Sequence, residues 1–530
     1  MRRHVLALAL ASLPFAARGV TGQAPSKPFR PTLVVHLAVD QLRPDYLELY
    51  RAQFTGGLAR LMGGGAYFPN GYQDHGITET APGHSTMMSG RFPRGTGIVA
   101  NDAGVLDPQM PLIGTPGDPA SPYRFRGTVL GDWLRFNDVR SRLVSVSRKD
   151  RSAILPLGRA KGEAYWYAPR SGFFTTSRYY ADTLPEWVQR FNARRLPQAQ
   201  FGTTWDLLLP PSAYPEADSV VAESKGKDFT FPHRVPTDPA IANEGLKDFP
   251  VMDQILAALA LEAVNVRELG KDPTRTDFLS VSFSTTDAIG HRYGPDSREI
   301  HDQIVRLDRT LGVFLDSLYK LRDSSSVILS LTADHGVAPF PGKDLVTRYR
   351  TTPAGRFNPR PAVSALSESL LKAGVDQAGF LWDMGVLYLD PVYFARARVN
   401  RDSVARAFAR AMSKVDGVLR ADVYADLVKR GLKADDITRR WLQMFPEDVP
   451  VAVVVTMRPF WYWQFQVDAL HGTPHEYDAR VPVIFYGAGI KPGRHEDKVR
   501  VVDIAPTLAA ALSIRPMEKL DGRVLTAVLR

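Results

Sequence analysis

The sequence predicts an α/β protein with a mainly parallel central sheet that is flanked by helices and carries inserted cap elements. Three apolar runs are typical of buried parallel strands, namely PTLVVHLAVD, DFLSVSFSTTDAIGH and SSVILSLTADHG. Each run leads into acidic or imidazole side chains, and the carboxyl ends of parallel strands meet at the same edge of a sheet. We therefore expect these polar side chains to lie together at that edge.

The segments between these runs supply the helices that such a sheet requires. Helical spacing follows the first run in RPDYLELYRAQFTGGLARLMGGG, where a glycine run closes it. Two further helical patterns, VMDQILAALALEAVNVREL and REIHDQIVRLDRTLGVFLDSLYKL, each lead into one of the acidic strands. They are the crossover connections that parallel strands need. Near the C-terminus, the core resumes with VPVIFYGAGI and the helix VVDIAPTLAAAL.

Two long segments interrupt this alternation, and we expect both to be insertions into a single domain of residues 25–530. The first, at about 160–250, is rich in aromatic residues, prolines and polar turns. The second, at about 341–461, contains the helical stretches DSVARAFARAMSKV and YADLVKRGL. The second segment is expected to form a smaller cap.

The composition limits both the cofactors and the partners. The 530 residues include no cysteine, so any metal must be held by oxygen and imidazole ligands. The formal net charge of +10 favours anionic substrates. No dense tract of lysine and arginine with interleaved aromatics is present, so no stable nucleic-acid partner is expected.

The first residues are typical of an export signal. Residues 1–24 combine a basic start, a short apolar run and small residues suited to cleavage. We expect removal of this signal peptide and a periplasmic or secreted product, with an uncleaved N-terminal anchor as the alternative. No later segment is a long uninterrupted apolar run, so no membrane span is expected after signal removal.

Several potential metal ligands stand at or beyond the ends of the apolar runs. They are Asp40, Asp287, His291, Asp334, His335 and His471. A single Asp-His pair is usually a hydrogen-bonded turn, but these residues divide into two sets, each with enough oxygen and imidazole donors for a zinc ion. The pattern outlines a two-metal site.

The segment TETAPGHSTMMSGRFPRGTGIVAND contains a candidate nucleophile, Thr80. Pro82 fits the first turn of a helix and Gly90 its end, so Thr80 lies where backbone N–H groups point outward and can receive a phosphate. A divalent cation lowers the pKa of a bound hydroxyl and so activates it as a nucleophile. The alternative is that Thr80 is only a helix cap.

Together these motifs resemble the alkaline phosphatase superfamily along the whole mature chain. The ordered series is AVDQLRPDYL, TETAPGHSTMMSGRFPRGTGIVAND, TTDAIGHRYGPDS, LTADHG and HGTPHEYDARVPVIFYG. The threonine in its T-x-P-x-H context resembles two branches, the nucleotide pyrophosphatase/phosphodiesterases and the periplasmic phosphate-irrepressible alkaline phosphatases. The resemblance implies an alkaline-phosphatase-like core in residues 25–530.

The resemblance also assigns the ligands of two Zn²⁺ ions. It implies that Asp40, Asp334 and His335 hold one zinc ion together with Thr80. It implies that Asp287, His291 and His471 hold the other, with His475 as the alternative third ligand. His471 is preferred because HGTP followed by YDARVP resembles the monoesterase pattern. The aspartate-rich set also suits manganese or iron.

Four further residues are implied to bind the phosphoryl group. Lys149 and Arg151, in SRKDRSAILPLGR, resemble the Lys-x-Arg pair of the monoesterases, and their charges suit a phosphate dianion. Asn101 and the amide of Ala81 are implied to donate hydrogen bonds to nonbridging oxygens. The alternatives are a solvated basic turn around Asp150 and a simple Asn-Asp turn.

These features predict an exported, metal-dependent alkaline phosphatase that hydrolyses small-molecule phosphate monoesters through a phosphothreonine intermediate. A phosphodiesterase or nucleotide pyrophosphatase is the alternative, and a non-catalytic protein that binds phosphoryl ligands is a third hypothesis. A sulfatase is disfavoured because TAPGH departs from the C/S-x-P-x-R context of that class. The sequence predicts no particular oligomeric state.

Overall fold

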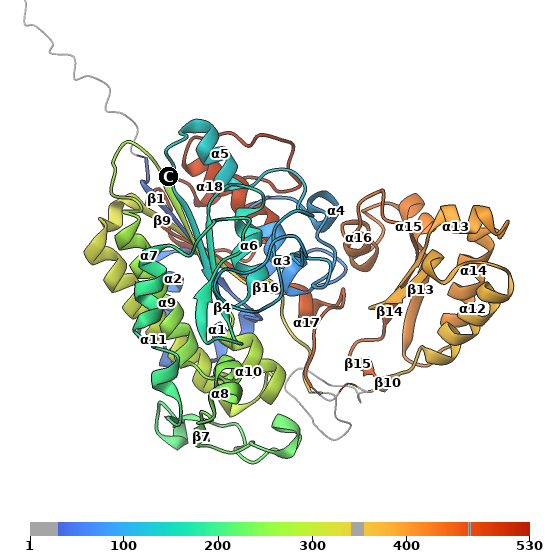
Figure 1. Ribbon diagram of the computed structural model, residues 1–530, viewed down its shortest axis with the longest axis horizontal. Coiled ribbons are helices and arrows are strands. Elements are labelled where there is room, and N and C mark those ends of the chain that lie inside the picture. The colour runs from blue at the N-terminus through green and yellow to red at the C-terminus, as the bar shows by residue number, and fades with distance from the viewer. Residues whose placement is uncertain (1–29, 341–354, 465, 467) are drawn as a thin grey trace, which may run out of the picture. The chain divides into compact units, whose positions relative to one another are not determined.

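The computed structural model describes residues 30–340, 355–464, 466 and 468–530, so the predicted signal peptide lies outside the described residues (Figure 1). Within them, ten strands form one mixed sheet in which most neighbours are parallel, and helices flank it. The predicted fold class is confirmed. In spatial order, the strands are β17 (Gly493–Arg494), β2 (Ala66–Tyr72), β16 (Arg480–Gly487), β9 (Val327–Thr332), β1 (Leu33–Val39), β8 (Asp277–Phe283), β3 (Leu143–Ser147), β4 (Glu163–Ala168) and β5 (Phe173–Thr175), and β18 (Val499–Arg500) pairs with β2.

The three predicted parallel strands are adjacent at the centre of this sheet. β1 lies between β8 and β9 and is parallel to both. Val39 is in register with Phe283, and Ala38 with Thr332. Because the strands are in register, the residues that follow all three emerge at one edge.

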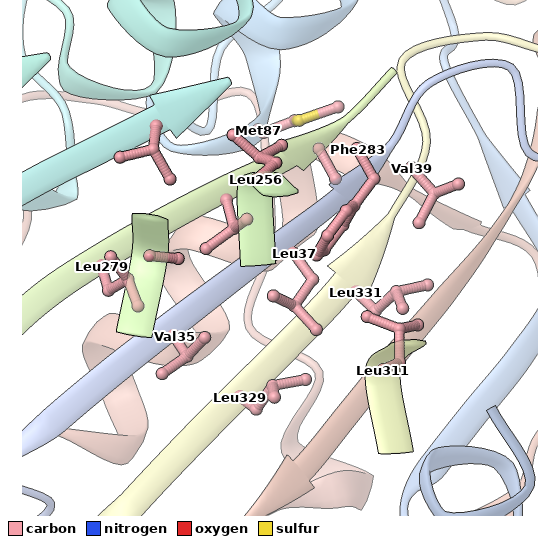
Figure 2. Close-up of a cluster of buried hydrophobic side chains, with 14 of the residues drawn as sticks. Val35, Leu37, Val39, Met87, Leu256, Leu279, Phe283, Leu311, Leu329 and Leu331 are labelled. Carbon is pink, nitrogen blue, oxygen red and sulfur yellow. The ribbon is translucent and has the colours of Figure 1, made fainter. Parts of the chain in front are cut away.

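One face of these strands packs against the two predicted crossover helices, α9 (Val251–Val266) and α11 (Arg298–Leu321). Figure 2 shows side chains such as Leu37 of β1 and Leu331 of β9 in a buried cluster with Leu256 of α9 and Leu311 of α11. Side chains alternate between the faces of a strand. Apolar residues at every second position therefore supply the core that anchors the site.

The opposite face carries small polar side chains and receives helix α3 (Thr80–Met87). His36 of β1 lies between Ser330 Oγ, 2.9 Å from its Nδ1, and Met87 Sδ, 3.3 Å from its Nε2. Burial lowers the pKa of His36 to about 3, so this imidazole is neutral and acts as a packing residue. Short side chains on the strands let α3 lie close to the sheet.

The remaining helices surround the sheet or form its connections. They include α1 (Pro44–Leu49), α2 (Gly57–Gly64), α4 (Pro93–Thr96), α5 (Leu130–Asn137), α6 (Asp150–Ile154), α7 (Glu186–Ala193), α8 (Pro239–Gly245), α10 (Thr285–Tyr293), α17 (Glu476–Ala479) and α18 (Ile504–Ala511). No single helix of the described residues is long and apolar enough to cross a membrane. Residues 239–248 and 251–266, which are bent by 87°, reach that length and apolar composition only as a pair.

Residues 355–464 contain a separate antiparallel sheet with its own hydrophobic core. Its strands are β11 (Phe380–Asp383), β12 (Val386–Leu389), β14 (Val451–Met457) and β13 (Val418–Val423), and its helices are α12 (Arg360–Lys372), α13 (Pro391–Arg396), α14 (Arg401–Met412), α15 (Tyr424–Arg430) and α16 (Asp436–Leu442). A short parallel pair joins β10 (Gly355–Phe357) to β15 (Trp461–Trp463). The helices α14 and α15 fall on the two stretches for which helical spacing was predicted. In the other interrupting segment, β4 and β5 extend the central sheet.

Candidate active site

The first ligand group, Asp40, Asp334 and His335, lies at the shared carboxyl edge of β1 and β9. Asp40 directly follows β1, and Asp334 and His335 follow β9 within three residues. All three are fully buried, and one ligand atom of each lies within 4.8 Å of the others. The register of the two parallel strands therefore brings together residues that are almost 300 positions apart.

The second ligand group, Asp287, His291 and His471, is carried by helix α10 and by the loop before α17. Asp287 and His291 are four residues apart and so share one face of α10. The His291 Nε2 atom is 3.1 Å from Asp287 Oδ1, and His471 Nε2 is 3.7 Å from the same oxygen. The alternative residue, His475, places its Nε2 2.8 Å from the carbonyl oxygen of Met457 instead.

The three imidazoles of the two groups are oriented in the same way. Their Nδ1 atoms lie 2.9, 2.5 and 2.8 Å from backbone carbonyl oxygens, those of Gly336, Ala469 and Thr78 for His335, His291 and His471 respectively. A carbonyl accepts only from N–H, so each Nδ1 carries the hydrogen and each Nε2 is free to ligate. Such fixed tautomers are typical of metal-ligating histidines.

The charge balance of the site fits cations. Asp40, Asp287 and Asp334 converge with Lys149, whose ammonium contacts Asp40 Oδ2 and lies 2.6 Å from Asp287 Oδ2. Burial, followed by the charges of Asp287 and Asp334, raises the pKa of Asp40 well above its ordinary value. Among the described residues, no donor forms a hydrogen bond with the buried Asp40 Oδ1. Buried carboxylate oxygens without donors are costly, and divalent cations would satisfy them.

Thr80 begins helix α3 beside the first ligand group. Its Oγ1 lies 3.5 Å from His335 Nε2 and 3.3 Å from Lys149 Nζ, and the residue is buried. The helix approaches the end of β9 so closely that a Cβ atom on Gly83 would lie 2.2 Å from the Asp334 carbonyl oxygen. Glycine at that position therefore permits the threonine hydroxyl to reach the ligands.

The other predicted phosphate-binding residues surround Thr80. The Ala81 N–H donates to Asn101 Oδ1 over 2.8 Å, and the Asn101 N–H donates to Glu79 Oε2 over 2.8 Å. Burial raises the pKa of the Glu79 carboxyl. The Asn101 side chain is thus oriented by the first turn of α3, and its NH2 group is the part left to donate elsewhere.

Arg151 lies on the short helix α6, one residue beyond Asp150 and two beyond Lys149. Its guanidinium is 3.6 Å from Asp150 Oδ1. Lys149, Arg151, Asp287 and His291 all line one open cavity of about 540 Å³. The structure therefore brings the predicted cationic pair to the same cavity as the second ligand group.

Two buried residues that were not predicted hold the ligands in place. Gln41 donates from its backbone N–H to Asp334 Oδ1 over 3.1 Å and from its side chain to Asp287 Oδ1 over 2.9 Å, so it bridges both groups. His84 Nδ1 is 3.2 Å from Asp334 Oδ2. The T-x-P-x-H spacing could have indicated His84, because positions four apart share a helix face with Thr80. Gln41 has no comparable signal apart from its position after Asp40.

Similarity to known proteins defines the class to which the chain belongs. A model of the type I phosphodiesterase / nucleotide pyrophosphatase family matches residues 34–430. The chain belongs to this family, and the predicted resemblance is confirmed.

Particular relatives lie on the phosphatase side of that class. Alkaline phosphatase PhoV of Synechococcus elongatus is 31% identical over 94% of this chain and 93% of its own. Alkaline phosphatase PafA of Elizabethkingia meningoseptica is 29% identical over 94% of this chain and 95% of its own. The crystal structure of wild-type PafA matches with a TM-score of 0.86 at 28% identity, covering 94% of this chain and 99% of that chain. A PafA variant with a threonine, an asparagine, a lysine and an arginine replaced matches with a TM-score of 0.85.

Proposed function

We propose that the chain is an exported, metal-dependent alkaline phosphatase that hydrolyses phosphate monoesters through a phosphothreonine intermediate. The observation that carries the proposal is the position of Lys149. Its ammonium reaches the hydroxyl of Thr80 and carboxylates of both ligand groups at once. A cation at this point would lie beside a phosphoryl group that is being transferred to Thr80.

The first ligand group together with Thr80 would hold one zinc ion, and the second ligand group would hold the other. The fit rests on two sets of oxygen and imidazole ligand atoms and on the buried Asp40 Oδ1, which lacks a hydrogen bond among the described residues. When bound, the two ions would supply Lewis acidity that lowers the pKa of the attacking hydroxyl and neutralises charge on the leaving oxygen.

The residues of the chain account for the remaining steps. The Thr80 hydroxyl loses its proton and its oxygen forms a bond to phosphorus while the bond from phosphorus to the alcohol oxygen breaks. The departing oxygen takes up a proton and leaves as the alcohol. Lys149, Arg151 and the NH2 group of Asn101 would donate to the nonbridging oxygens, where charge must be held. The Ala81 N–H, which was predicted to donate to a nonbridging oxygen, donates to Asn101 Oδ1 in the structure, so we propose that it orients Asn101. Water then attacks phosphorus, and this second displacement releases inorganic phosphate and restores the Thr80 hydroxyl.

The choice of a monoester over a diester rests on charge. A monoester dianion has more charge to neutralise than a diester. Lys149 provides a cation 3.3 Å from Thr80 Oγ1, and Arg151 provides a second one in the cavity that Lys149 also lines. The replaced residues of the PafA variant are of the same types as Thr80, Asn101, Lys149 and Arg151 here. This parallel supports the same assignment in this chain.

The proposal also covers the localisation, the substrates and the domain organisation of the enzyme. The basic and apolar N-terminus of residues 1–24 supports removal of a signal peptide and a periplasmic or secreted mature domain. The substrates would be small-molecule phosphate monoesters, drawn in by the positive net charge. Within the mature domain, residues at about 160–250 and 341–461 would be insertions around one core.

The test compares zinc-loaded hydrolysis of p-nitrophenyl phosphate and bis-p-nitrophenyl phosphate by the wild type and by Lys149→Ala and Arg151→Ala. We expect a preference for the monoester that collapses in both variants. A preference for the diester that both variants retain would instead make the protein a phosphodiesterase. Phosphate binding without turnover of either ester by the loaded protein would support the non-catalytic hypothesis.

A further inference from the structure

The cavity beside the second ligand group is strongly basic. Its volume is about 540 Å³, and Asp287 and His291 form part of its wall. Its basic residues are Arg148, Lys149, Arg151, Lys225, Lys247 and Arg292. Its lining contains only half as many acidic residues, so a net positive charge faces the cavity.

Most of these cations already have partners. Arg292 donates to Asp248 over 3.0 Å and to Asp228 over 2.8 Å, which ties helix α10 to neighbouring turns. Lys225 forms an ion pair with Asp468 at 3.2 Å. Lys247 pairs with Glu244, and Lys149 belongs to the site around Thr80. These contacts explain their presence without any ligand.

Arg148 differs from these cations because one of its donors is buried without a hydrogen-bond partner among the described residues. It follows β3 directly, is half-buried and precedes Lys149 in the chain. Its Nε is buried without a hydrogen-bond partner among the described residues. The charge of Arg148 acts on the carboxyls of Asp248 and Asp253, but neither carboxylate satisfies this Nε. A guanidinium presents several donors in a planar fork that suits phosphate and carboxylate. Leaving the Nε donor of Arg148 buried and unpaired is unfavourable unless a ligand satisfies it.

We propose that this cavity binds a second anionic group on the alcohol portion of the substrate and that Arg148 receives it. The inference rests on the proposed function, because it takes the leaving alcohol to lie on the side of the second ligand group. The preferred substrates are then phosphate monoesters whose alcohol carries a further phosphate or carboxylate. Arg148 determines specificity, whereas Lys149 and Arg151 bind the phosphoryl group that is transferred.

Three sugar derivatives with the same phosphate at carbon 6 test this proposal. Fructose 6-phosphate has a neutral far end, 6-phosphogluconate has a carboxylate there, and fructose 1,6-bisphosphate has a second phosphate. Initial rates of phosphate release from each give kcat/KM for the metal-loaded wild type. We expect both doubly anionic compounds to exceed fructose 6-phosphate by roughly tenfold, beyond the factor of two that the bisphosphate gains from its two ends. This preference should weaken as salt is added.

Arg148→Ala should reduce this preference by roughly tenfold, and Arg148→Lys should retain part of it, because lysine keeps the charge but not the fork. Arg170→Ala is the matched control, since Arg170 is exposed and does not line the cavity, and it should leave the preference unchanged. Calorimetric binding to the Thr80→Ala protein gives a readout apart from turnover. There, Arg148→Ala should weaken the binding of fructose 1,6-bisphosphate more than that of fructose 6-phosphate.

The outcomes separate this inference from the proposed function. If the wild type releases no phosphate from fructose 6-phosphate or p-nitrophenyl phosphate, the phosphatase assignment fails. If it releases phosphate from all three sugars at equal efficiency, or if Arg148→Ala and Arg148→Lys keep the wild-type preference, the anion-binding role of Arg148 is wrong. If Arg148→Ala does not fold, as thermal melting would reveal, the partial loss expected for Arg148→Lys decides the question.

Discussion

The two ligand groups differ in exposure and in the elements that carry them. Asp40 and the Asp334-His335 pair extend two adjacent parallel strands and are fully inaccessible to solvent. In the second group, His291 lies on a helix with 26% of its side chain exposed, and His471 is on a loop. The buried group adjoins the proposed nucleophile. The second group, here called the exposed group because its two histidines are partly accessible, contributes Asp287 and His291 to the wall of the basic cavity. In the proposed mechanism, the attacking side is thus fixed by the sheet, and the leaving-group side is the more accessible of the two.

The largest effect should come from the nucleophile beside the buried group. Thr80→Ala removes the only hydroxyl proposed to attack phosphorus, so we expect turnover of p-nitrophenyl phosphate to fall at least about a thousandfold. Thr80→Ser keeps a hydroxyl and should retain a measurable part of the rate. Elemental analysis should find the same metal content in both variants. An alanine variant within tenfold of the wild type would rule out the phosphothreonine route.

The strands and helices of the site were predictable because their patterns are local. β1, β8 and β9 are short apolar runs, and the spacing of α9 and α11 is regular over many residues. For residues 44–64, the sequence predicted helical spacing but not the break that separates α1 from α2. At this break, the N–H groups of Thr55 and Gly56 donate to Asp308 Oδ2. The carboxylate that stabilises the break is therefore about 250 residues away in the sequence. A contact over such a separation leaves no local pattern.

The candidate site was likewise predictable only where its residues belong to a local pattern. Asp40 and Asp334 could be placed because each follows a recognisable strand. Gln41 could not be, because its bridging role depends on a backbone φ of 66° and on two aspartates that only the folded sheet brings together. For a similar reason, Arg148 was not identified from the sequence as a functional residue. The sequence does not show that its Nε is buried without a hydrogen bond among the described residues while the cations around it are paired.

Metal removal should distinguish the two groups by their exposure. We expect a chelator to abolish activity and to remove metal in two phases, the faster from the exposed second group. His471→Ala should eliminate the faster phase and His335→Ala the slower one. At a metal concentration a thousand times Kd, a bound ion stabilises the folded state by about 4 kcal/mol, so chelation should also lower Tm. Loss of both ions at one rate would contradict the distinction.

A smaller effect should follow from removing the support of the buried group. His84 contacts Asp334, so we expect His84→Asn to weaken metal binding at the first group by roughly 10–100-fold while the second group is spared. His36→Asn is the matched control, because His36 is equally buried but contacts Ser330 and Met87 and none of the ligands. Competition with a chromogenic chelator measures both. Equal losses in the two variants would mean that His84 is only a packing residue.

The smallest effect concerns the loop of the exposed group, which Asp478 supports by accepting the Thr473 N–H over 2.9 Å and the Thr473 hydroxyl over 2.6 Å. Burial raises the pKa of Asp478 to about 7. The folded state therefore holds this proton more tightly than the unfolded state does. The resulting contribution to stability is present in full below the ordinary carboxyl pKa and is lost as pH rises through about 7.

The variant Asp478→Asn can still accept both hydrogen bonds but does not titrate. In chelated protein, the free energy of unfolding of the wild type should thus fall relative to this variant by roughly 1 kcal/mol per pH unit between about pH 5 and 6.5. Urea denaturation at several pH values measures the difference, and a difference independent of pH would mean that Asp478 is already ionised in the folded protein.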